Sequence, residues 1–271
     1  MFVVTAYTYY VVYAYDPGVW SKLVAKYMFD LMDKIPKPLL IAGVHKSFGS
    51  LRALTDVSFT IEPGRIHGII GPNGSGKTTL FNCISGIIPP DSGHIYFGDT
   101  RISGLRADRI AKAGIRRTFQ AGKLAPSLTV LENIMSGNSS QKTRALEREA
   151  RELLESLGMG EAADRWAADL VWAERQFVQI LRAIIGKPTV LLLDEPVSGM
   201  DAGETELVVK LIGKINAMGI TVAVVSHDIK MLMDTAEWVT VLNFGEKIAE
   251  GTPSTIRKDP LVMEAYLGTE E

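Results

Sequence analysis

The segment Gly71-Pro72-Asn73-Gly74-Ser75-Gly76-Lys77-Thr78 fits the pattern Gly-x4-Gly-Lys-[Ser/Thr] of a phosphate-binding loop. It stands between the apolar run 66–70 and the helix-like run 79–87, where a loop that joins a strand to a helix belongs. Glycine lets the backbone turn successive N–H groups towards phosphates, and the helix N-terminus adds a positive dipole. The pattern predicts a nucleoside triphosphate site in which Lys77 contacts the β- and γ-phosphates and Thr78 ligates Mg²⁺. A chance glycine turn is the alternative, and the adjoining strand and helix disfavour it.

Length, charge and cysteine content narrow the class of protein. A chain of 271 residues suits one large domain or two closely joined lobes. Its net charge of −2 and the absence of a Lys/Arg-rich block give no electrostatic footprint for nucleic acid, so no nucleic-acid partner is expected. The single cysteine, Cys83, excludes an internal disulfide and a cysteine metal site, and its place on an apolar helix predicts core packing in a reducing compartment.

The first 38 residues differ in composition from the rest. Segment 1–15 is apolar and uncharged, but it is shorter than the roughly 20 residues that a membrane-spanning helix needs. Between Trp20 and Ile35, apolar residues recur at helical spacing, which predicts an amphipathic helix in an N-terminal extension, 1–38. Such a helix suits a membrane surface or a partner helix. An ordinary docking helix, or a start codon placed too far upstream, is an equal alternative.

From residue 39 the pattern is that of one continuous domain, 39–268. A mostly helical stretch, about 121–186, follows the phosphate loop, and later strands alternate with helices. This alternation predicts an α/β fold with a parallel sheet and crossover helices. The expected strands are 40–46, 53–61, 66–70, 94–97, 190–194, 221–225 and 238–243, and the expected helices in the helical stretch are 129–135, 143–157 and 174–185.

A second chemical motif is Val190-Leu191-Leu192-Leu193-Asp194-Glu195-Pro196. Four apolar residues lead to two carboxylates at the C-terminal end of a strand, where ligands bind in open α/β sheets. Asp194 is expected to hold Mg²⁺, and Glu195 to orient and deprotonate an attacking water. An acidic strand end is common by itself, but its combination with the phosphate loop favours triphosphate hydrolysis.

With these motifs, residues 39–268 resemble the ATP-binding cassette (ABC) ATPases. The resemblance implies a P-loop NTPase core with a parallel sheet, an antiparallel β subdomain and a helical subdomain, and it implies ATP and Mg²⁺ as ligands. Gln120 resembles the Q-loop glutamine, which senses Mg²⁺ and the lytic water and contacts the membrane partner. Ser198-Gly199-Met200-Asp201 resembles the D-loop, in which Asp201 would face a second subunit. His227 resembles the switch histidine at the γ-phosphate, and Phe48 stands where the family stacks an aromatic ring on adenine.

Each of these residues has a plainer alternative when it is taken singly. Gln120 and Phe48 suit ordinary surface or core positions, Asp201 suits a helix N-cap, and His227 suits a helix start. Their order and spacing favour the functional roles. The resemblance thus assigns catalysis to Glu195, His227 and Gln120, magnesium to Thr78, Gln120 and Asp194, and nucleotide contacts to Phe48, Gly71, Pro72, Asn73, Gly74, Ser75, Gly76, Lys77, Thr78 and Thr79.

Two further stretches narrow the resemblance to ATPase subunits of branched-chain amino acid importers and their urea and amide relatives. These are Arg116-Arg117-Thr118-Phe119-Gln120 and the C-terminal pieces Glu250-Gly251-Thr252-Pro253, Asp259-Pro260 and Ala265-Tyr266-Leu267-Gly268. This branch implies an ATP hydrolase that is peripheral on the cytoplasmic face of the membrane and docks on permease subunits. An extracytoplasmic binding protein would deliver the solute, which this chain does not name.

The signature motif of the family, usually Leu-Ser-Gly-Gly-Gln, is altered. Counting back ten residues from Ile180-Leu181-Arg182-Ala183-Ile184 places Leu170-Val171-Trp172-Ala173-Glu174 at the signature. Val171 has no hydroxyl for a phosphate, which removes a hydrogen bond of a kind worth roughly 1.5–3 kcal/mol. Ala173 adds a Cβ where backbone is expected to approach the phosphate closely. We expect a weakened signature, and tolerance of the variation by this branch is the alternative.

The altered signature bears on the subunit partner. In the family each ATP lies between one subunit's phosphate loop and the other's signature, so Leu170–Glu174, Ser198, Gly199 and Asp201 are expected at a dimer interface. The sequence leads to the hypothesis of a heterodimer, in which a different ABC subunit with a full signature completes the site on this chain. A weakly hydrolysing regulatory or interaction ABC protein is one alternative function, and a soluble non-transport ABC ATPase is another.

Overall fold

The computed structural model describes residues 37–118, 123–138 and 143–267. Lys37–Glu271 forms one compact unit. Apart from Lys37 and Pro38, the expected N-terminal extension lies outside the described residues, and so does Gln120. Within the described ranges, no helix combines the length and the apolar character that crossing a membrane requires.

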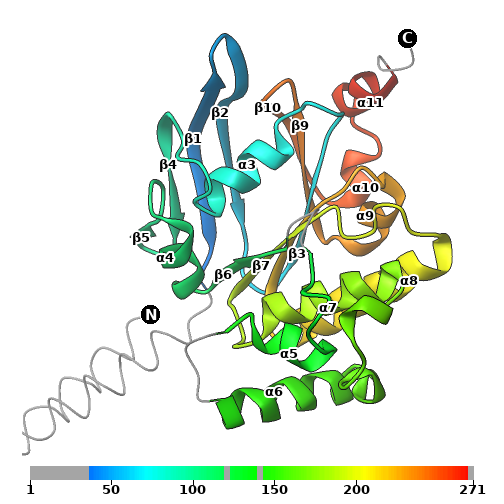
Figure 1. The fold of residues 1–271 in the computed structure, drawn as a ribbon. Helices are drawn as coiled ribbons and strands as arrows, with labels where there is room; N and C mark the ends of the chain where they lie inside the picture. The colour runs from blue at the N-terminus through cyan, green and yellow to red at the C-terminus, as the bar shows by residue number, and fades with distance from the viewer. Residues whose placement is uncertain (1–36, 119–122, 139–142, 268–271) are drawn as a thin grey trace, which may run out of the picture. The chain divides into compact units, whose positions relative to one another are not determined.

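A six-stranded sheet in the order β10-β9-β3-β8-β7-β6 forms the centre of this unit (Figure 1). Neighbouring strands pair in parallel, except that β10 is antiparallel to β9. All residues of β3, β7 and β8 are buried, as expected of strands that are covered on both faces. The strands are β3 (Ile66–Ile70), β6 (Ile115–Arg117), β7 (Val190–Asp194), β8 (Thr221–Val225), β9 (Trp238–Asn243) and β10 (Glu246–Gly251).

A second, antiparallel sheet has the order β2-β1-β4-β5. Its strands are β1 (Leu39–Phe48), β2 (Leu51–Ile61), β4 (Ser92–Phe97) and β5 (Thr100–Arg101). Helix α3 (Lys77–Ile84) lies between this sheet and the central one, and its buried face shares one apolar cluster with both (Figure 1). The expected antiparallel β subdomain is thereby confirmed.

The helix-like run 79–87 was expected to continue beyond the observed end of α3. The helix ends at Ile84, because Ser85 caps it and Gly86 takes a left-handed φ of 71°. A glycine in this conformation just after a helix is a common stop signal. Ile87 is therefore an exposed residue outside the helix rather than part of its buried face.

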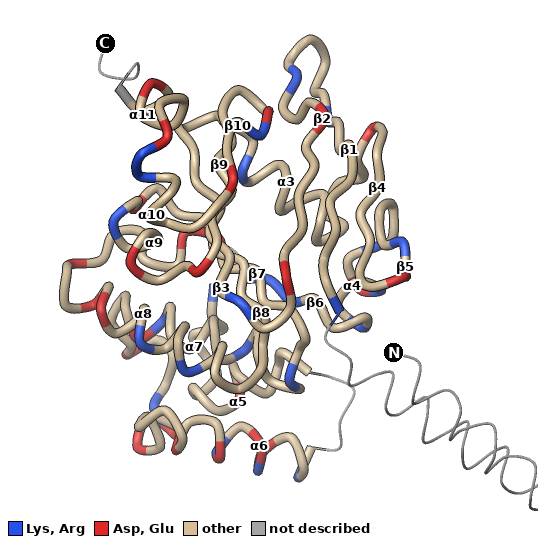
Figure 2. The backbone as a smooth tube through the Cα atoms, turned by 180° about the vertical axis from the view of Figure 1, so that it is seen from behind, with Lys and Arg blue, Asp and Glu red and all other residues tan. Residues whose placement is uncertain are grey.

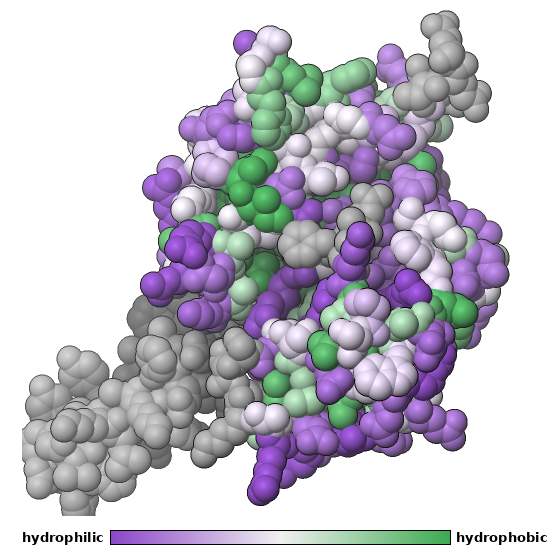
Figure 3. Space-filling view, in the orientation of Figure 1, coloured by the Kyte–Doolittle hydropathy of each residue, from purple (hydrophilic) through white to green (hydrophobic). Residues whose placement is uncertain are grey.

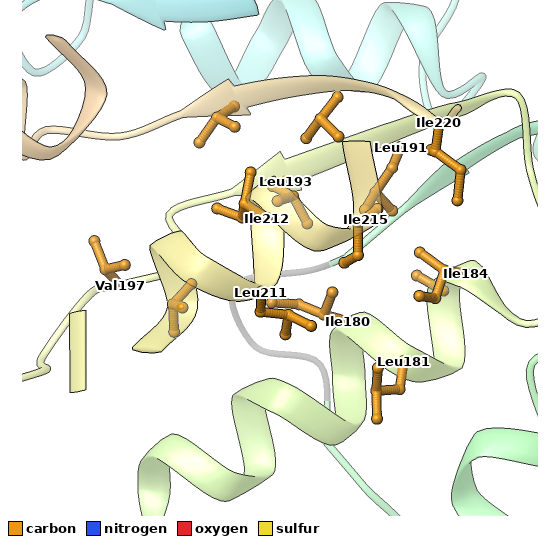
Figure 4. Close-up of a cluster of buried hydrophobic side chains, with 14 of the residues drawn as sticks. Ile180, Leu181, Ile184, Leu191, Leu193, Val197, Leu211, Ile212, Ile215 and Ile220 are labelled. Carbon is orange, nitrogen blue, oxygen red and sulfur yellow. The ribbon is translucent and has the colours of Figure 1, made fainter. Parts of the chain in front are cut away.

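Alternate residues of β7 serve two separate cores. Val190 and Leu192 belong to the cluster around α3, whereas Leu191 and Leu193 belong to a cluster on the opposite face of the sheet. This is the period of two that a strand imposes on its side chains. Figure 4 shows the second cluster, in which side chains of β7, α7 (Trp172–Ile184) and α8 (Ala202–Ala217) face one another. Burying each such aliphatic side chain stabilises the fold by about 1.5–3 kcal/mol relative to exposure.

Three helices follow the phosphate-loop half of the chain, and the first of them packs on the other two. They are α5 (Val130–Met135), α6 (Thr143–Ser156) and α7, and the 3-10 turns Gly160–Ala162 and Ala167–Asp169 lie between α6 and α7. On α6, Leu146, Ala150 and Leu154 are buried at a spacing of four, and charges of both signs alternate on the outer side (Figure 2). The helices expected at 129–135, 143–157 and 174–185 correspond to these three.

The remaining helices in the described part of the chain connect strands or follow the central sheet. They are α4 (Ala107–Lys112), α9 (Ile229–Thr235), α10 (Pro253–Ile256) and α11 (Pro260–Leu267). On the face shown in Figure 3, hydrophobic side chains occur in separate groups among hydrophilic ones.

Candidate active site

The phosphate loop connects the end of β3 at Ile70 to the start of α3 at Lys77. Two of its glycines are required by close packing. Gly71 has a φ of 155°, and a Cβ there would collide with the carbonyl oxygen of Leu242 on β9. Gly76 has a φ of 99°, and a Cβ there would lie 2.5 Å from the carbonyl oxygen of Ala53 on β2. Only glycine lets this loop curl between the two sheets.

Lys77 folds back on the loop. Its Nζ donates to the carbonyl oxygens of Gly71 at 2.7 Å and Pro72 at 2.9 Å, and lies 3.4 Å from Ser75 Oγ. Burial lowers the pKa of the Lys77 ammonium, against the opposing influence of the Glu195 and Asp194 carboxylates. The cation is thus held by neutral carbonyl groups, for which an anionic phosphate is a stronger competitor.

Asp194 ends β7 beside the loop and is 5% exposed. Its Oδ2 lies 2.6 Å from Arg117 Nη2, while its Oδ1 has no hydrogen-bond partner among the residues that the structure describes. An unpaired buried carboxylate oxygen is costly unless a ligand satisfies it. A hard divalent cation with a preference for oxygen, such as Mg²⁺, fits this atom.

Glu195 turns away from the strand that positions it. Its φ of 51° lies in the left-handed region, where a non-glycine residue costs on the order of 1–3 kcal/mol, a strain that gathers at functional sites. Its Oε2 accepts from the Nδ1 of His227 at 2.7 Å and from the backbone N–H of His227 at 3.2 Å. Since an ionised carboxylate only accepts hydrogen bonds, Nδ1 carries the proton and Nε2 is left for another ligand.

Lys77, Glu195 and His227 line one pocket of about 620 Å³. It lies between the β1–β2 hairpin, the phosphate loop with the first turn of α3, and the Glu195–His227 pair. Phe48 is half exposed at its wall, with Lys46 Nζ 5.7 Å from the ring centroid. The lining residues are Phe48, Leu51, Arg52, Ala53, Asn73, Gly74, Ser75, Gly76, Lys77, Thr78, Thr79, Glu195 and His227.

Most residues expected to contact nucleotide or to act in catalysis are therefore brought together. Gly71, Pro72 and Asp194 do not line the pocket, but all three lie one contact away through Lys77 or Glu195. The five signature residues and the D-loop residues Ser198, Gly199 and Asp201 are not among the lining residues. They form a separate group, in which Trp172 Nε1 donates to the carbonyl oxygen of Ser198 at 3.1 Å.

The signature segment opens α7. Val171 is the N-cap residue, with extended backbone (φ −72°, ψ 168°) and a side chain that makes no capping bond; the residue is 62% exposed. Glu174 Oε2 accepts from the Val171 N–H at 3.0 Å, and the hydrogen bond from Arg165 lowers the pKa of the Glu174 carboxyl. Leu170 and Ala173 are buried. The Ala173 methyl group thus lies in the interior. Of the two departures from the usual signature, at Val171 and Ala173, the one at Val171 changes the exposed surface.

Asp201 and His227 occupy the plainer positions that were considered for them. Asp201 is the N-cap of α8, where its carboxylate accepts from the Glu204 N–H at 2.8 Å. His227 immediately precedes Asp228, the N-cap of α9. For His227 the helix-start position coexists with the contact to Glu195. Contact of Asp201 with a second subunit stays a prediction.

Five residues at or near the site were not expected from the motifs. Leu51, Arg52 and Ala53 line the pocket because the hairpin turn after Phe48 brings them beside it. Arg117 holds Asp194, and the backbone of Gly71 hydrogen-bonds Tyr266 on α11. Burial raises the pKa of the Tyr266 hydroxyl to about 12. The short turn after Phe48 was a usable signal for the first three, whereas the other two contacts join distant parts of the chain.

The chain resembles known families of proteins along most of its length. Residues 54–198 match the family model of ABC transporters, and residues 246–271 match that of branched-chain amino acid ATP-binding cassette transporters. The high-affinity branched-chain amino acid transport ATP-binding protein LivG of Escherichia coli is 36% identical over 252 residues, which cover 86% of this chain and 98% of LivG. The corresponding protein BraF of Pseudomonas aeruginosa is 35% identical over 251 residues, with the same coverage of each chain.

Solved structures of similar fold carry the same description. The ADP conformation of an ATP-binding cassette of an ABC transporter has a TM-score of 0.80 and 31% sequence identity, and the match covers 86% of this chain and 99% of that one. A nucleotide-free ATP-binding cassette from an ABC transporter has a TM-score of 0.78 and 30% sequence identity, and the match covers 85% of this chain and 98% of that one.

Proposed function

Since this chain belongs to the ABC transporter family of ATP-binding cassettes, we propose that it is the ATP-hydrolysing subunit of an importer for branched-chain amino acids or related small polar solutes. The observation that carries the proposal is the pocket in which the phosphate loop meets the Glu195–His227 pair. The names of the relatives and the match at residues 246–271 support the solute class. We assign the ATPase domain to 39–268 and its helical subdomain to about 121–186, which includes α5 and the two helices that pack on it, α6 and α7.

The phosphate loop and Phe48 bind the nucleotide in this proposal. Backbone N–H groups of the loop and the positive end of α3 hold the phosphates, and Lys77 exchanges its carbonyl partners for the β- and γ-phosphate oxygens. The exposed ring of Phe48 offers a face on which adenine stacks. Phosphate binding therefore replaces neutral acceptors of Lys77 by charged ones.

Glu195 is the general base. Its Oε2 is held by His227, which leaves Oε1 to orient the attacking water and take its proton. His227 Nε2 is the ring nitrogen that faces the γ-phosphate. Positioning and neutralisation of charge account for most of the catalysis in this reaction class.

Thr78, Asp194 and Gln120 would hold Mg²⁺. The unpaired Oδ1 of Asp194 supports the assignment among the described residues, and Gln120 lies outside them. When bound, the ion neutralises charge on the β- and γ-phosphates.

A different ABC subunit completes the site in this proposal. The partner's signature would cover the ATP on this chain, while the partner's own ATP would meet the exposed Val171 side chain. To test the asymmetry, ATPase rates of the purified pair are compared after Glu195→Gln here and after the equivalent change in the partner. We expect the greater loss from Glu195→Gln, because this chain's own catalytic groups are present; equal losses would contradict the asymmetry.

Membrane permeases are the further partners, and an extracytoplasmic solute-binding protein acts through them. The relatives are named as transport ATP-binding proteins, which supports a peripheral position on the cytoplasmic face of the membrane. The chain would then drive permeases that select the solute.

The function is tested with the chain reconstituted with its permeases in proteoliposomes. Glu195→Gln should lower ATP turnover and leucine uptake at least a hundredfold while ATP still binds, because a general base contributes about 10²–10⁴-fold. Glu206→Gln, on the exposed side of α8 where Glu206 pairs with Lys210, is the matched control and should leave both rates unchanged. Uptake that persists in Glu195→Gln would refute the proposed role.

A further inference from the structure

A buried guanidinium connects the phosphate-loop helix to the carboxylate at the end of β7. Arg117, the last residue of β6, has a side chain that is 5% exposed. Its Nη1 donates to Asn82 Oδ1 at 2.7 Å and to Ser85 Oγ at 3.0 Å, both on or at the end of α3. Its Nη2 donates to Asp194 Oδ2 at 2.6 Å. One planar group on β6 therefore contacts both α3, whose first turn lines the pocket, and the end of β7.

The contact with Arg117 gives the two carboxylate oxygens of Asp194 different environments. Oδ2 is held by Arg117, whereas Oδ1 has no hydrogen-bond partner among the described residues. Because the first bond fixes the carboxylate plane, it also fixes where Oδ1 points. Partners of this kind orient metal ligands in many proteins and influence metal affinity from outside the coordination sphere.

Arginine suits this arrangement better than lysine does. The guanidinium presents several N–H donors in a rigid plane, so that separate nitrogens reach α3 and Asp194 at the same time. The ring of Phe81 lies 5.5 Å from the guanidinium carbon and packs against it. A lysine ammonium is a single point donor on a flexible stem and cannot reproduce this geometry.

We propose that Arg117 is a positioning residue that holds the Asp194 carboxylate so that its second oxygen receives Mg²⁺ with the bound nucleotide. The proposal rests on the proposed ATPase function. Arg117 could also weaken metal binding, because its positive charge lies close to the metal ligand Asp194 and repels a second cation. Orientation and repulsion predict changes of opposite sign when the arginine is removed.

The test measures metal binding and nucleotide binding separately. Mn²⁺ replaces Mg²⁺ and is followed by electron paramagnetic resonance, with the full-length chain and an ATP analogue that carries a β,γ-imido group. Arg117→Met should weaken Mn²⁺ binding to the protein–nucleotide complex about 10–100-fold, the usual effect of removing an outer partner of a ligand. Nucleotide affinity in EDTA should stay unchanged, which a general loss of structure would not allow.

Two milder variants extend the test to the case in which Arg117→Met does not fold. Arg117→Lys keeps the charge and should weaken Mn²⁺ binding by a smaller factor, and Asn82→Ala, which removes one anchor of the guanidinium, should act in the same direction. Arg116→Met is the matched control, because Arg116 lies on the same strand but donates to the carbonyl oxygen of Gly137 at 2.8 Å. It should leave Mn²⁺ affinity unchanged.

Results other than these contradict either the positioning role of Arg117 or the proposed ATPase function. Unchanged or tighter Mn²⁺ binding in the Arg117 variants refutes positioning, and so does a loss of nucleotide affinity in EDTA by the same factor. A native chain that binds neither the analogue nor Mn²⁺ with it contradicts the proposed ATPase function instead.

Discussion

Replacing Val171 by serine should stabilise α7 and strengthen the signature together. Among the described helices, α5, α7 and α8 each have a glutamate at the third position that accepts from the N-cap N–H, but only α5 and α8 of these three have a polar N-cap side chain. Thr129 on α5 and Asp201 on α8 each accept a hydrogen bond from the residue three positions on, whose carboxylate returns one to the cap N–H. On α7, Glu174 makes this return bond to Val171, and the forward bond is absent.

The structure sets the size of the effect. Val171 already has the extended backbone of an N-cap, so serine needs no rearrangement to accept from the Glu174 N–H. A polar N-cap contributes about 1 kcal/mol relative to an apolar one. For a domain of this size, that gain raises the midpoint of thermal unfolding by roughly 2–4 °C. The same hydroxyl would face a partner's phosphate with a hydrogen bond worth about 1.5–3 kcal/mol, which is about ten- to a hundredfold in rate.

Two assays separate these effects. Thermal unfolding of the purified chain measures the cap, and ATPase turnover of the assembled pair, with the site on this chain silenced by Glu195→Gln, measures the signature. Val171→Ala is the control, since it removes the exposed apolar side chain without supplying a hydroxyl. If Val171→Ser unfolds at the same temperature as Val171→Ala, the capping argument is wrong. If stability rises while turnover stays the same, Val171 does not face a phosphate.

The other predictions concern acid stability, loop packing and the C-terminal helix. Burial lowers the pKa of His67 from 6.5 to about 3, so on acidification the unfolded chain binds this proton before the folded chain does. The free energy of unfolding should therefore fall below pH 6.5, by about 2 kcal/mol at pH 5. Chemical denaturation from pH 8 to 5 should show this fall, and His67→Gln should remove it. Gly76→Ala should lower the stability by about 2 kcal/mol or more in thermal unfolding and weaken ATP binding, because the added Cβ would collide with the Ala53 carbonyl oxygen. Gly64 has a φ of 73° with open space around it, so Gly64→Ala should cost only backbone strain. Equal losses of stability in the two variants would contradict the packing argument. Tyr266→Phe should weaken ATP binding about fivefold in a fluorescence titration, since one hydrogen bond to the Gly71 backbone contributes about 1 kcal/mol, and an unchanged affinity would exclude a role for this contact.

The central strands were predictable because they are covered on both faces. β3, β7, β8 and β9 have the bounds expected from their mostly apolar runs, and the polar residues His67 on β3 and Thr240 on β9 are buried and hydrogen-bonded to each other. β6 and β10 were not predicted. They are edge strands of the sheet, and the charged residues Arg116, Arg117, Glu246 and Lys247 hide their apolar pattern.

The chemical core of the site was predictable for a related reason. The carboxyl ends of parallel strands lie at one edge, so motifs that directly follow β3, β7 and β8 were bound to meet. Arg117 and Asp194 are 77 residues apart, and their contact depends on the packing of a short edge strand. No local pattern encodes such a contact. The same holds for Tyr266, which reaches Gly71 only because α11 packs on β10.

The proposed signature and Glu195 are connected by hydrogen bonds within this chain. The Trp172 indole N–H donates to the carbonyl oxygen of Ser198, whose own N–H donates to the carbonyl oxygen of Glu195. Two hydrogen bonds therefore link Trp172, at the start of α7, through Ser198 to Glu195, the proposed general base. An event that moves the start of α7, such as contact with a partner's phosphate at Val171, acts on the segment that directly follows Glu195. In the proposed dimer, the altered signature would bear on the partner's ATP through Val171 and on the ATP of this chain through Trp172, so the two sites would be unequal but not independent.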